Sequence, residues 1–157
     1  MNKCCLTVSA VLLISLLAAQ EDETWTPMNP GPFLKTIKMI HQPPELLFQG
    51  RPYDLELFVD FPLDSIETVS IYIKTDSMYT YLEIPLKDRQ GHFTYRFNPR
   101  RFKGNVVEYF FTVRLKDYKI FASPMDNVGQ IKPVHRTLID PVKYWEWRKN
   151  QYGNHGS

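Results

Sequence analysis

Residues 105–115 read NVVEYFFTVRL, and their alternating pattern decides the fold. In an extended chain, successive side chains point to opposite faces of the strand. One face of this segment would hold a row of apolar and aromatic side chains: Val107, Tyr109, Phe111, Val113 and Leu115. The other face would hold Glu108, Thr112 and Arg114. This pattern is typical of an antiparallel strand with one buried face.

The same period of two recurs in four other segments: KTIKMIH (35–41), YDLELFVDF (53–61), ETVSIYI (67–73) and GHFTYRF (91–97). Proline, glycine and Asp-Ser pairs separate these runs, as turns separate strands. We therefore predict an all-β fold over residues 35–124. It is expected to be a single antiparallel β-sandwich of about seven strands.

One hairpin can be assigned a register from the pattern. A loop at 75–78 pairs five positions across the turn: Lys74 with Tyr79, Ile73 with Thr80, Tyr72 with Tyr81, Ile71 with Leu82, and Ser70 with Glu83. This register gathers the isoleucines and leucine on one face and the tyrosines on the other. A slip of one residue would destroy both groups, so the pattern favours this pairing.

Two longer stretches resemble a known class of module. They are NPRRFKGNVVEYFFTVRLKDYKIFASP (98–124) and IETVSIYIKTDSMYTYLEIPLKDRQGHFTYRF (66–97), and together they resemble immunoglobulin-like or fibronectin-III-like modules of secreted bacterial proteins. In those modules a penultimate strand reads apolar-Glu-Tyr-aromatic-aromatic, and Ser-Pro follows a turn. The Cys…Trp…Cys core of antibody domains is absent. The resemblance implies adhesion, scaffolding or spacing, and it supplies no catalytic residues.

The first twenty residues form a separate element. Lys3 precedes LTVSAVLLISLLAA, an apolar run of roughly 14 residues, which suits a signal peptide and is short for a membrane span. Residues 1–20 are therefore predicted to be a signal peptide, with a retained N-terminal anchor as the alternative. Cys4 and Cys5 would leave with it, so the mature chain would have neither a disulfide nor a transmembrane segment.

Residues 21–34, EDETWTPMNPGPFL, contain three closely spaced prolines that exclude a helix and a central strand. We predict an extended Pro-rich linker or arm here, with Trp25 as its one anchor candidate.

Composition excludes several classes of function. The chain has 157 residues, 43% of them hydrophobic, and a net charge of +2, which fits one globular domain and gives no basic surface of the kind that binds nucleic acid. The four histidines are far apart, and no metal, nucleotide or hydrolase motif occurs. We expect no enzymatic activity, no cofactor and no metal.

The C-terminal region, residues 125–157, is predicted to be an extended strap followed by a short aromatic helix, and one added edge strand within the strap is left open. In DPVKYWEWRKNQY, Asp140 serves as the N-cap, Pro141 as the first helical residue and Gly153 as the stop. A helix sends Trp145 and Trp147 to different sides, and we assign Trp145 to the chain's own fold and Trp147 to a partner. In a strand, both tryptophans would share one face and could dock on the domain's own sheet.

Three surfaces are candidates for recognition. The first is the hairpin face with Tyr72, Tyr79 and Tyr81, which could also stack on a glycan. The second lies on the helix and comprises Tyr144, Trp147 and Arg148. The third is the basic loop formed by Arg96, Arg100, Arg101 and Lys103.

The combined prediction is an exported, non-catalytic binding or scaffolding module. We expect it to be a subunit or accessory protein of a cell-envelope or extracellular assembly, located in the periplasm, on the cell surface or outside the cell. A protein partner is expected. The alternative is a carbohydrate-binding module that uses the surface tyrosines.

Overall fold

The computed structural model describes residues 33–152. The predicted signal peptide, most of the Pro-rich arm with Trp25, and the helix stop at Gly153 lie outside the described residues. Of the arm, Phe33 and Leu34 are described, and Leu34 forms a parallel bridge to Phe121.

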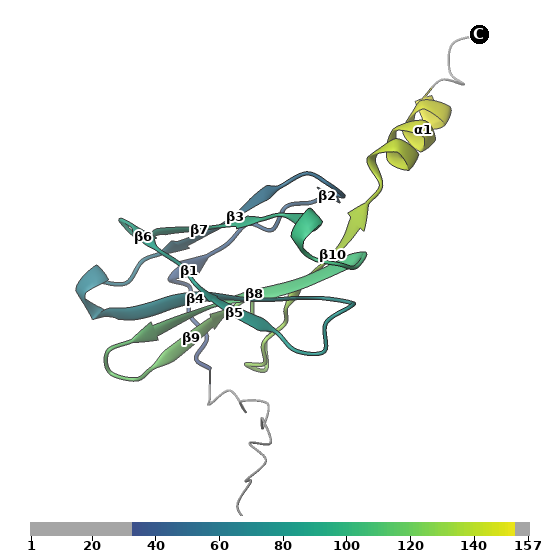
Figure 1. Ribbon diagram of the computed structural model, residues 1–157. Helices are drawn as coiled ribbons and strands as arrows, with labels where there is room; N and C mark the ends of the chain where they lie inside the picture. The colour runs from purple at the N-terminus through teal and green to yellow at the C-terminus, as the bar shows by residue number, and fades with distance from the viewer. Residues whose placement is uncertain (1–32, 153–157) are drawn as a thin grey trace, which may run out of the picture. The chain divides into compact units, whose positions relative to one another are not determined.

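Two β-sheets and one C-terminal helix make up the described chain (Figure 1). The first sheet has the order β1 (Met39–Ile40), β3 (Tyr53–Val59), β7 (His92–Phe97) and β6 (Asp88–Arg89), and all its pairs are antiparallel. The second has the order β2 (Leu47–Phe48), β10 (Val134–Ile139), β8 (Val106–Leu115), β4 (Ile66–Thr75) and β5 (Leu82–Pro85), and β9 (Ile120–Ser123) also pairs with β8. Two short 3-10 helices span Leu63–Ser65 and Pro99–Arg101, and α1 spans Pro141–Tyr152. The predicted all-β class with a short C-terminal helix is confirmed.

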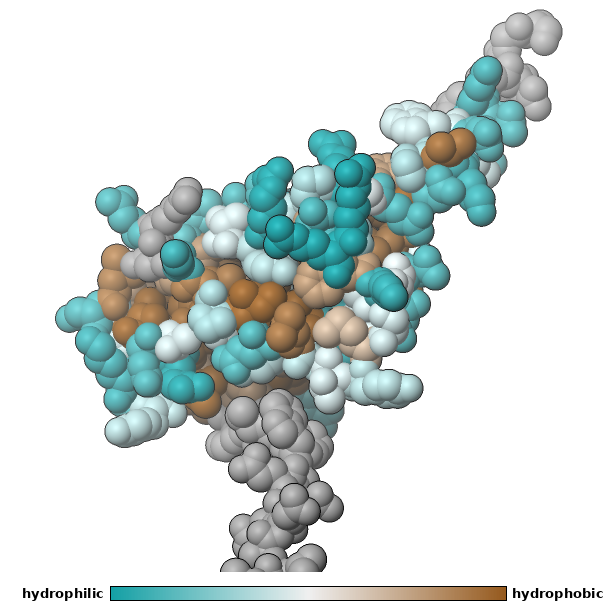
Figure 2. All heavy atoms as spheres, in the orientation of Figure 1, coloured by the Kyte–Doolittle hydropathy of each residue, from teal (hydrophilic) through white to brown (hydrophobic). Residues whose placement is uncertain are grey.

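The core lies between the two sheets, where the alternating positions predicted from the sequence meet. The buried side chains of the central strands are Leu55, Leu57 and Val59 of β3, Val69, Ile71 and Ile73 of β4, Phe93 and Phe97 of β7, and Val107, Tyr109, Phe111, Val113 and Leu115 of β8. Viewed from the side, apolar residues form a band between hydrophilic ones (Figure 2). Burial of these side chains is the main source of stability in such a fold.

Strands β9 and β10 lie on the same edge of β8. Strand β9 pairs with residues 111–114 of β8, and β10 pairs with residues 106–109. The chain therefore leaves this edge after Ser123 and returns to it at Val134, beyond residue 124, where the sequence pattern fades. A central arginine hides the alternation in β10: Val134 and Leu138 are buried, while the Nε of Arg136 between them donates to the Pro44 carbonyl at 2.8 Å.

The register predicted for the hairpin is wrong by two residues. The structure pairs Ile73 with Leu82 and Tyr72 with Glu83. A shift of two keeps the same side chains on each face, so the predicted faces survive. The loop is longer because Asp76 is tied to β8: its carboxylate accepts from the backbone N–H groups of Asn105 at 2.9 Å and Val106 at 3.3 Å.

Gly104 makes this loop contact possible. Its backbone has a φ of +128°, and the carboxylate of Asp76 occupies the place where a Cβ would stand. Only glycine adopts this conformation readily, and only glycine leaves the space that Asp76 needs.

Helix α1 begins as predicted. The Asp140 carboxylate accepts from the Val142 N–H at 2.9 Å, and Pro141 is the first helical residue. The helix contacts the sandwich through Tyr144, whose ring meets that of Phe48 at 5.2 Å. The assignment of Trp145 to the fold is wrong, because Trp145 and Trp147 are both 57% exposed.

Candidate functional site

The three hairpin tyrosines have different surroundings. Tyr72 stacks on Phe110 with a centroid distance of 4.9 Å and an interplanar angle of 2°. Tyr81 meets the same Phe110 ring edge-on at 5.2 Å. Tyr79 is fully exposed. Aromatic pairs of this kind stabilise a sheet by about 0.5–1.5 kcal/mol beyond the area they bury, so Tyr72 and Tyr81 have a structural role.

Glu108 links these tyrosines to the charged groups around them. Its Oε2 accepts from the Tyr81 hydroxyl at 3.0 Å and pairs with the Lys74 ammonium at 3.0 Å. Its Oε1 lies 3.3 Å from Nδ1 of His135. The hydrogen bond from Lys74 is the main reason that the pKa of the Glu108 carboxyl is lowered. The face is therefore a connected network rather than a bare platform.

Burial and hydrogen bonding also hold the tyrosines neutral. Burial, followed by a hydrogen bond to Glu83, raises the pKa of Tyr72 to about 12. Burial and the bond to Glu108 raise the pKa of Tyr81 further. A sugar ring stacking on Tyr72 would compete with Phe110 for that face of the ring. Tyr79 alone offers its whole side chain to a ligand.

The basic loop residues do not act alike. The Nη1 of Arg96 donates to both Asp54 carboxylate oxygens at 3.0 Å, so its charge is balanced. The carbonyl of Lys103 accepts from the hydroxyls of Thr75 at 2.5 Å and Ser77 at 2.6 Å. Arg100 and Arg101 lie exposed on the 3-10 helix Pro99–Arg101. Of these four residues, Arg100 lies beside the helix site described next.

Helix α1 presents most of its aromatic surface to solvent. Besides the two tryptophans, Val142 is 62% exposed. Tyr144 meets Trp145 edge-on at 5.4 Å and Trp147 at 6.2 Å, and the Arg148 guanidinium lies 5.3 Å from the Trp145 ring centre. The structure thus brings together the predicted Tyr144, Trp147 and Arg148, and it adds Trp145 to them. Tryptophan, tyrosine and arginine dominate the binding energy of protein interfaces.

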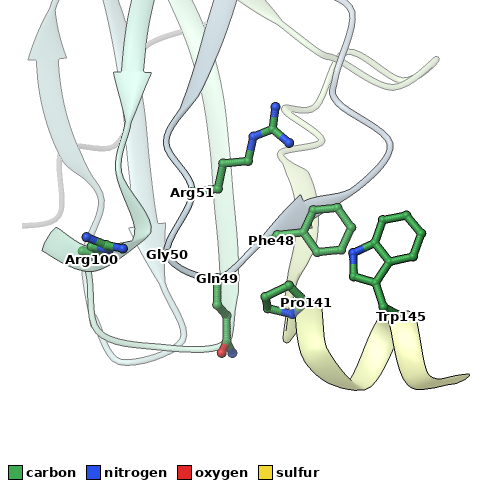
Figure 3. A pocket seen from close by; sticks show the side chains of 7 residues that line it. All are labelled: Phe48, Gln49, Gly50, Arg51, Arg100, Pro141 and Trp145. Carbon is green, nitrogen blue, oxygen red and sulfur yellow. The ribbon is translucent and has the colours of Figure 1, made fainter.

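A hollow of about 270 Å³ lies beside the start of α1. It is lined by Phe48, Gln49, Gly50, Arg51, Arg100, Pro141 and Trp145 (Figure 3). The sequence did not predict a role for Phe48 or Arg51. A general signal exists, because an aromatic residue beside an arginine at a turn resembles interface composition, but nothing in the sequence connects residues 48–51 with α1.

Sequence reasoning also missed a half-buried histidine in the sandwich. Nδ1 of His41 lies 2.6 Å from the Glu56 carbonyl, and Nε2 lies 2.9 Å from the Tyr109 hydroxyl. A carbonyl can only accept, so Nδ1 carries the proton and the Tyr109 hydroxyl donates to Nε2. Burial is the main cause that lowers the pKa of His41, and the nearby charge of Arg136 acts in the same direction.

Among residues 33–152, no three His, Cys, Asp or Glu side chains stand close enough together to hold a metal ion. No helix in the same range is long and apolar enough to cross a membrane.

Comparisons with known proteins return no family. No protein-family model matches the chain, and no curated protein matches it.

Proposed function

We propose that this chain is an exported, non-catalytic binding module with an immunoglobulin-like sandwich. It serves as a subunit or accessory protein of a cell-envelope or extracellular assembly. The observation that carries the proposal is the aromatic helix α1, whose two tryptophans are 57% exposed. Exposed tryptophan on a folded domain is unusual unless a partner covers it.

The strand order supports the immunoglobulin-like part of the proposal. Immunoglobulin strands lettered in chain order form one sheet with the order A-B-E-D and a second with C′-C-F-G. When the strands of this chain are lettered in the same way, β1-β3-β7-β6 corresponds to A-B-E-D, and β5-β4-β8 corresponds to C′-C-F. Strands β9 and β10 together occupy the G position, because both pair with the free edge of β8.

The packing of the hairpin favours protein recognition by α1 over sugar recognition by the tyrosines. Tyr72 and Tyr81 are held by Phe110 and Glu108, whereas Trp145 and Trp147 are exposed on α1. A sandwich gives a rigid base from which such a helix can present aromatic anchors, and rigidity reduces the entropy lost on binding.

Photocrosslinking in the native cell tests the proposal. Benzoylphenylalanine at position 147 should give a specific adduct with another envelope or extracellular protein. The matched control places the same group at Tyr118, an aromatic residue in the β8–β9 turn that is 85% exposed. Equal adducts at both positions, or none at 147, would refute recognition by α1.

Export is tested separately. N-terminal sequencing of the protein from fractionated cells should find a mature chain that begins close to Gln20, in an envelope or extracellular fraction. A full-length chain in the cytoplasm would contradict the exported location.

A further inference from the structure

The hollow beside α1 has two chemically different walls. On one side Phe48, Pro141 and Trp145 form an apolar wall, with the Phe48 ring and the Trp145 indole next to each other in Figure 3. Arg51 and Arg100 supply cationic groups, and Gly50, which precedes Arg51 in the chain, lies beside the Arg100 side chain. Ligand sites in proteins commonly combine an apolar surface with a few polar groups that set orientation.

The apolar wall is fixed by hydrogen bonds in the fold. Strand β2 pairs in parallel with β10, so Phe48 lies opposite Ile139, directly before the start of α1. The Tyr53 hydroxyl accepts from the Phe48 N–H at 2.8 Å, and the Gln49 N–H donates to the Ile139 carbonyl at 2.8 Å. The Tyr144 ring then packs against Phe48 from the helix. A wall held in this way needs little rearrangement to receive a side chain.

The cationic groups have no counterion within the described chain. Among the carboxylate side chains that the structure describes, none forms an ion pair with Arg51 or Arg100, whereas Arg96 is paired with Asp54 at 3.0 Å. The Arg51 guanidinium lies 5.8 Å from the Tyr53 ring centre. A Cβ at Gly50 would stand 3.7 Å from Nε of Arg100, so the Arg100 side chain runs close to bare backbone. Each guanidinium group can donate two parallel hydrogen bonds to one carboxylate.

The charge of α1 extends this basic region. The helix holds Lys143, Arg148 and Lys149 against a single acidic residue, Glu146. Its exposed apolar side chains are not gathered on one face, because at 100° per residue Trp147 points roughly 140–160° away from Val142 and Trp145. A helix that lies on a membrane surface needs one continuous apolar face. The arrangement suits a protein segment with negative charge better than a lipid surface.

We infer that this hollow binds an acidic peptide segment of the partner protein. A large apolar or aromatic side chain of that segment packs against Phe48 and Trp145, and a neighbouring Asp or Glu carboxylate accepts from Arg51 or Arg100. The inference rests on the proposed function, and it names the chemistry of the partner. Charge complementarity supplies specificity and a fast association rate, while the buried aromatic contact supplies most of the affinity.

A peptide selection tests the inference on the mature chain. A random dodecapeptide library displayed on phage should yield sequences with Asp or Glu within a few positions of Phe, Trp, Tyr or Leu. A fluorescein-labelled synthetic copy of the most enriched peptide then gives a dissociation constant by fluorescence anisotropy. Added salt should weaken that binding, because exposed charge pairs are screened.

Variants locate the binding site. Arg51→Gln combined with Arg100→Gln should weaken binding of the synthetic peptide about tenfold or more, and Trp145→Ala should do the same. Arg96→Gln is the matched control, because Arg96 is an exposed arginine already paired with Asp54, and it should leave binding unchanged. Urea midpoints close to that of the unchanged chain establish that the variants fold.

Several outcomes would overturn the inference. These are a selection that enriches nothing, enriched peptides without acidic residues, or binding that survives loss of both arginines. A dimer in sedimentation that Trp145→Ala dissociates would identify a second copy as the occupant. Co-sedimentation with phosphatidylglycerol vesicles that the double arginine variant loses would identify a lipid. If any of these results were obtained together with a specific crosslink at position 147, the proposed function would stand and only this binding site would be rejected.

Discussion

Strand β8 carries three aromatic residues and helix α1 carries four, and the two elements use them in opposite ways. In β8, Tyr109 and Phe111 are buried in the core between the sheets, and Phe110 is buried on the opposite face against the rings of Tyr72 and Tyr81. In α1, the Tyr144 ring packs against Phe48 of the sandwich, whereas Trp145 and Trp147 are both 57% exposed. The aromatic residues of β8 stabilise the fold, and we propose that the exposed tryptophans of α1 serve recognition.

The largest predicted effect concerns strand β8, whose Phe111 lies in the core. Phe111 has no solvent-exposed surface and packs with His41 and Tyr109 between the sheets. Phe111→Ala leaves a cavity, so we expect a loss of about 3–5 kcal/mol in the free energy of unfolding. Urea denaturation followed by circular dichroism measures this. A loss below about 1 kcal/mol would mean that β8 does not form the core.

A smaller effect is expected from one hydroxyl on the same strand. Tyr109→Phe keeps the ring but removes the donor to Nε2 of His41. Nδ1 must keep its proton for the Glu56 carbonyl, so Nε2 loses its only protein donor in the described chain. An unsatisfied buried acceptor costs about 1–3 kcal/mol, which chemical denaturation can measure. Tyr118→Phe, at an exposed tyrosine, is the control and should change nothing.

The same histidine makes stability depend on pH. The pKa of His41 is lowered in the folded chain, so the unfolded chain takes up a proton first as the pH falls below 6.5. The stability that neutral His41 provides is therefore complete above pH 6.5 and is lost as the pH falls towards the folded pKa. The slope contributed by one group cannot exceed about 1.4 kcal/mol per pH unit.

His41→Gln isolates this contribution. A glutamine amide can donate to one neighbour and accept from another, as neutral His41 does, but it does not titrate between pH 5 and 8. The free energy of unfolding should fall more steeply from pH 7 to pH 5 in the unchanged chain than in the variant. Parallel curves would show that His41 titrates alike in the folded and unfolded states.

Local sequence patterns predicted the central strands and the start of α1. They failed where contacts between segments distant in the sequence determine the structure. Alternation was sufficient for β8, because five successive inward positions are apolar or aromatic. It was insufficient for β10, where Arg136 interrupts the inward row. The alternation assigned the hairpin side chains to the correct faces. The register, however, depends on the hydrogen bond that the Asn105 N–H, just before β8, donates to the Asp76 carboxylate. That contact joins residues 29 positions apart.

The candidate site shows the same division. Tyr144, Trp147 and Arg148 could be named from the sequence, because exposed aromatic residues on a short helix are conspicuous. Phe48 and Arg51 could not be named, because they join α1 only through the parallel pairing of β2 with β10. Parallel pairs connect chain segments that are distant in sequence, and no local pattern reveals such a partner. Trp145 was misassigned because a helical stripe tells which residues share a side and not which side meets the sandwich.

The smallest predicted effect concerns Trp147 of helix α1. Trp147→Ala removes a large side chain, but Trp147 is 57% exposed, and its ring centre lies 6.2 Å from that of Tyr144 in the same helix. We expect the free energy of unfolding to change by less than about 0.5 kcal/mol, because surface substitutions away from caps and networks usually stay within that range. Urea denaturation of Trp147→Ala and Phe111→Ala under the same conditions measures both losses in the free energy of unfolding on one scale. A loss of several kcal/mol for Trp147→Ala would erase the contrast between β8 and α1, because Trp147 would then belong to the fold. A negligible loss, together with a specific adduct from benzoylphenylalanine at position 147, would assign this aromatic surface to binding.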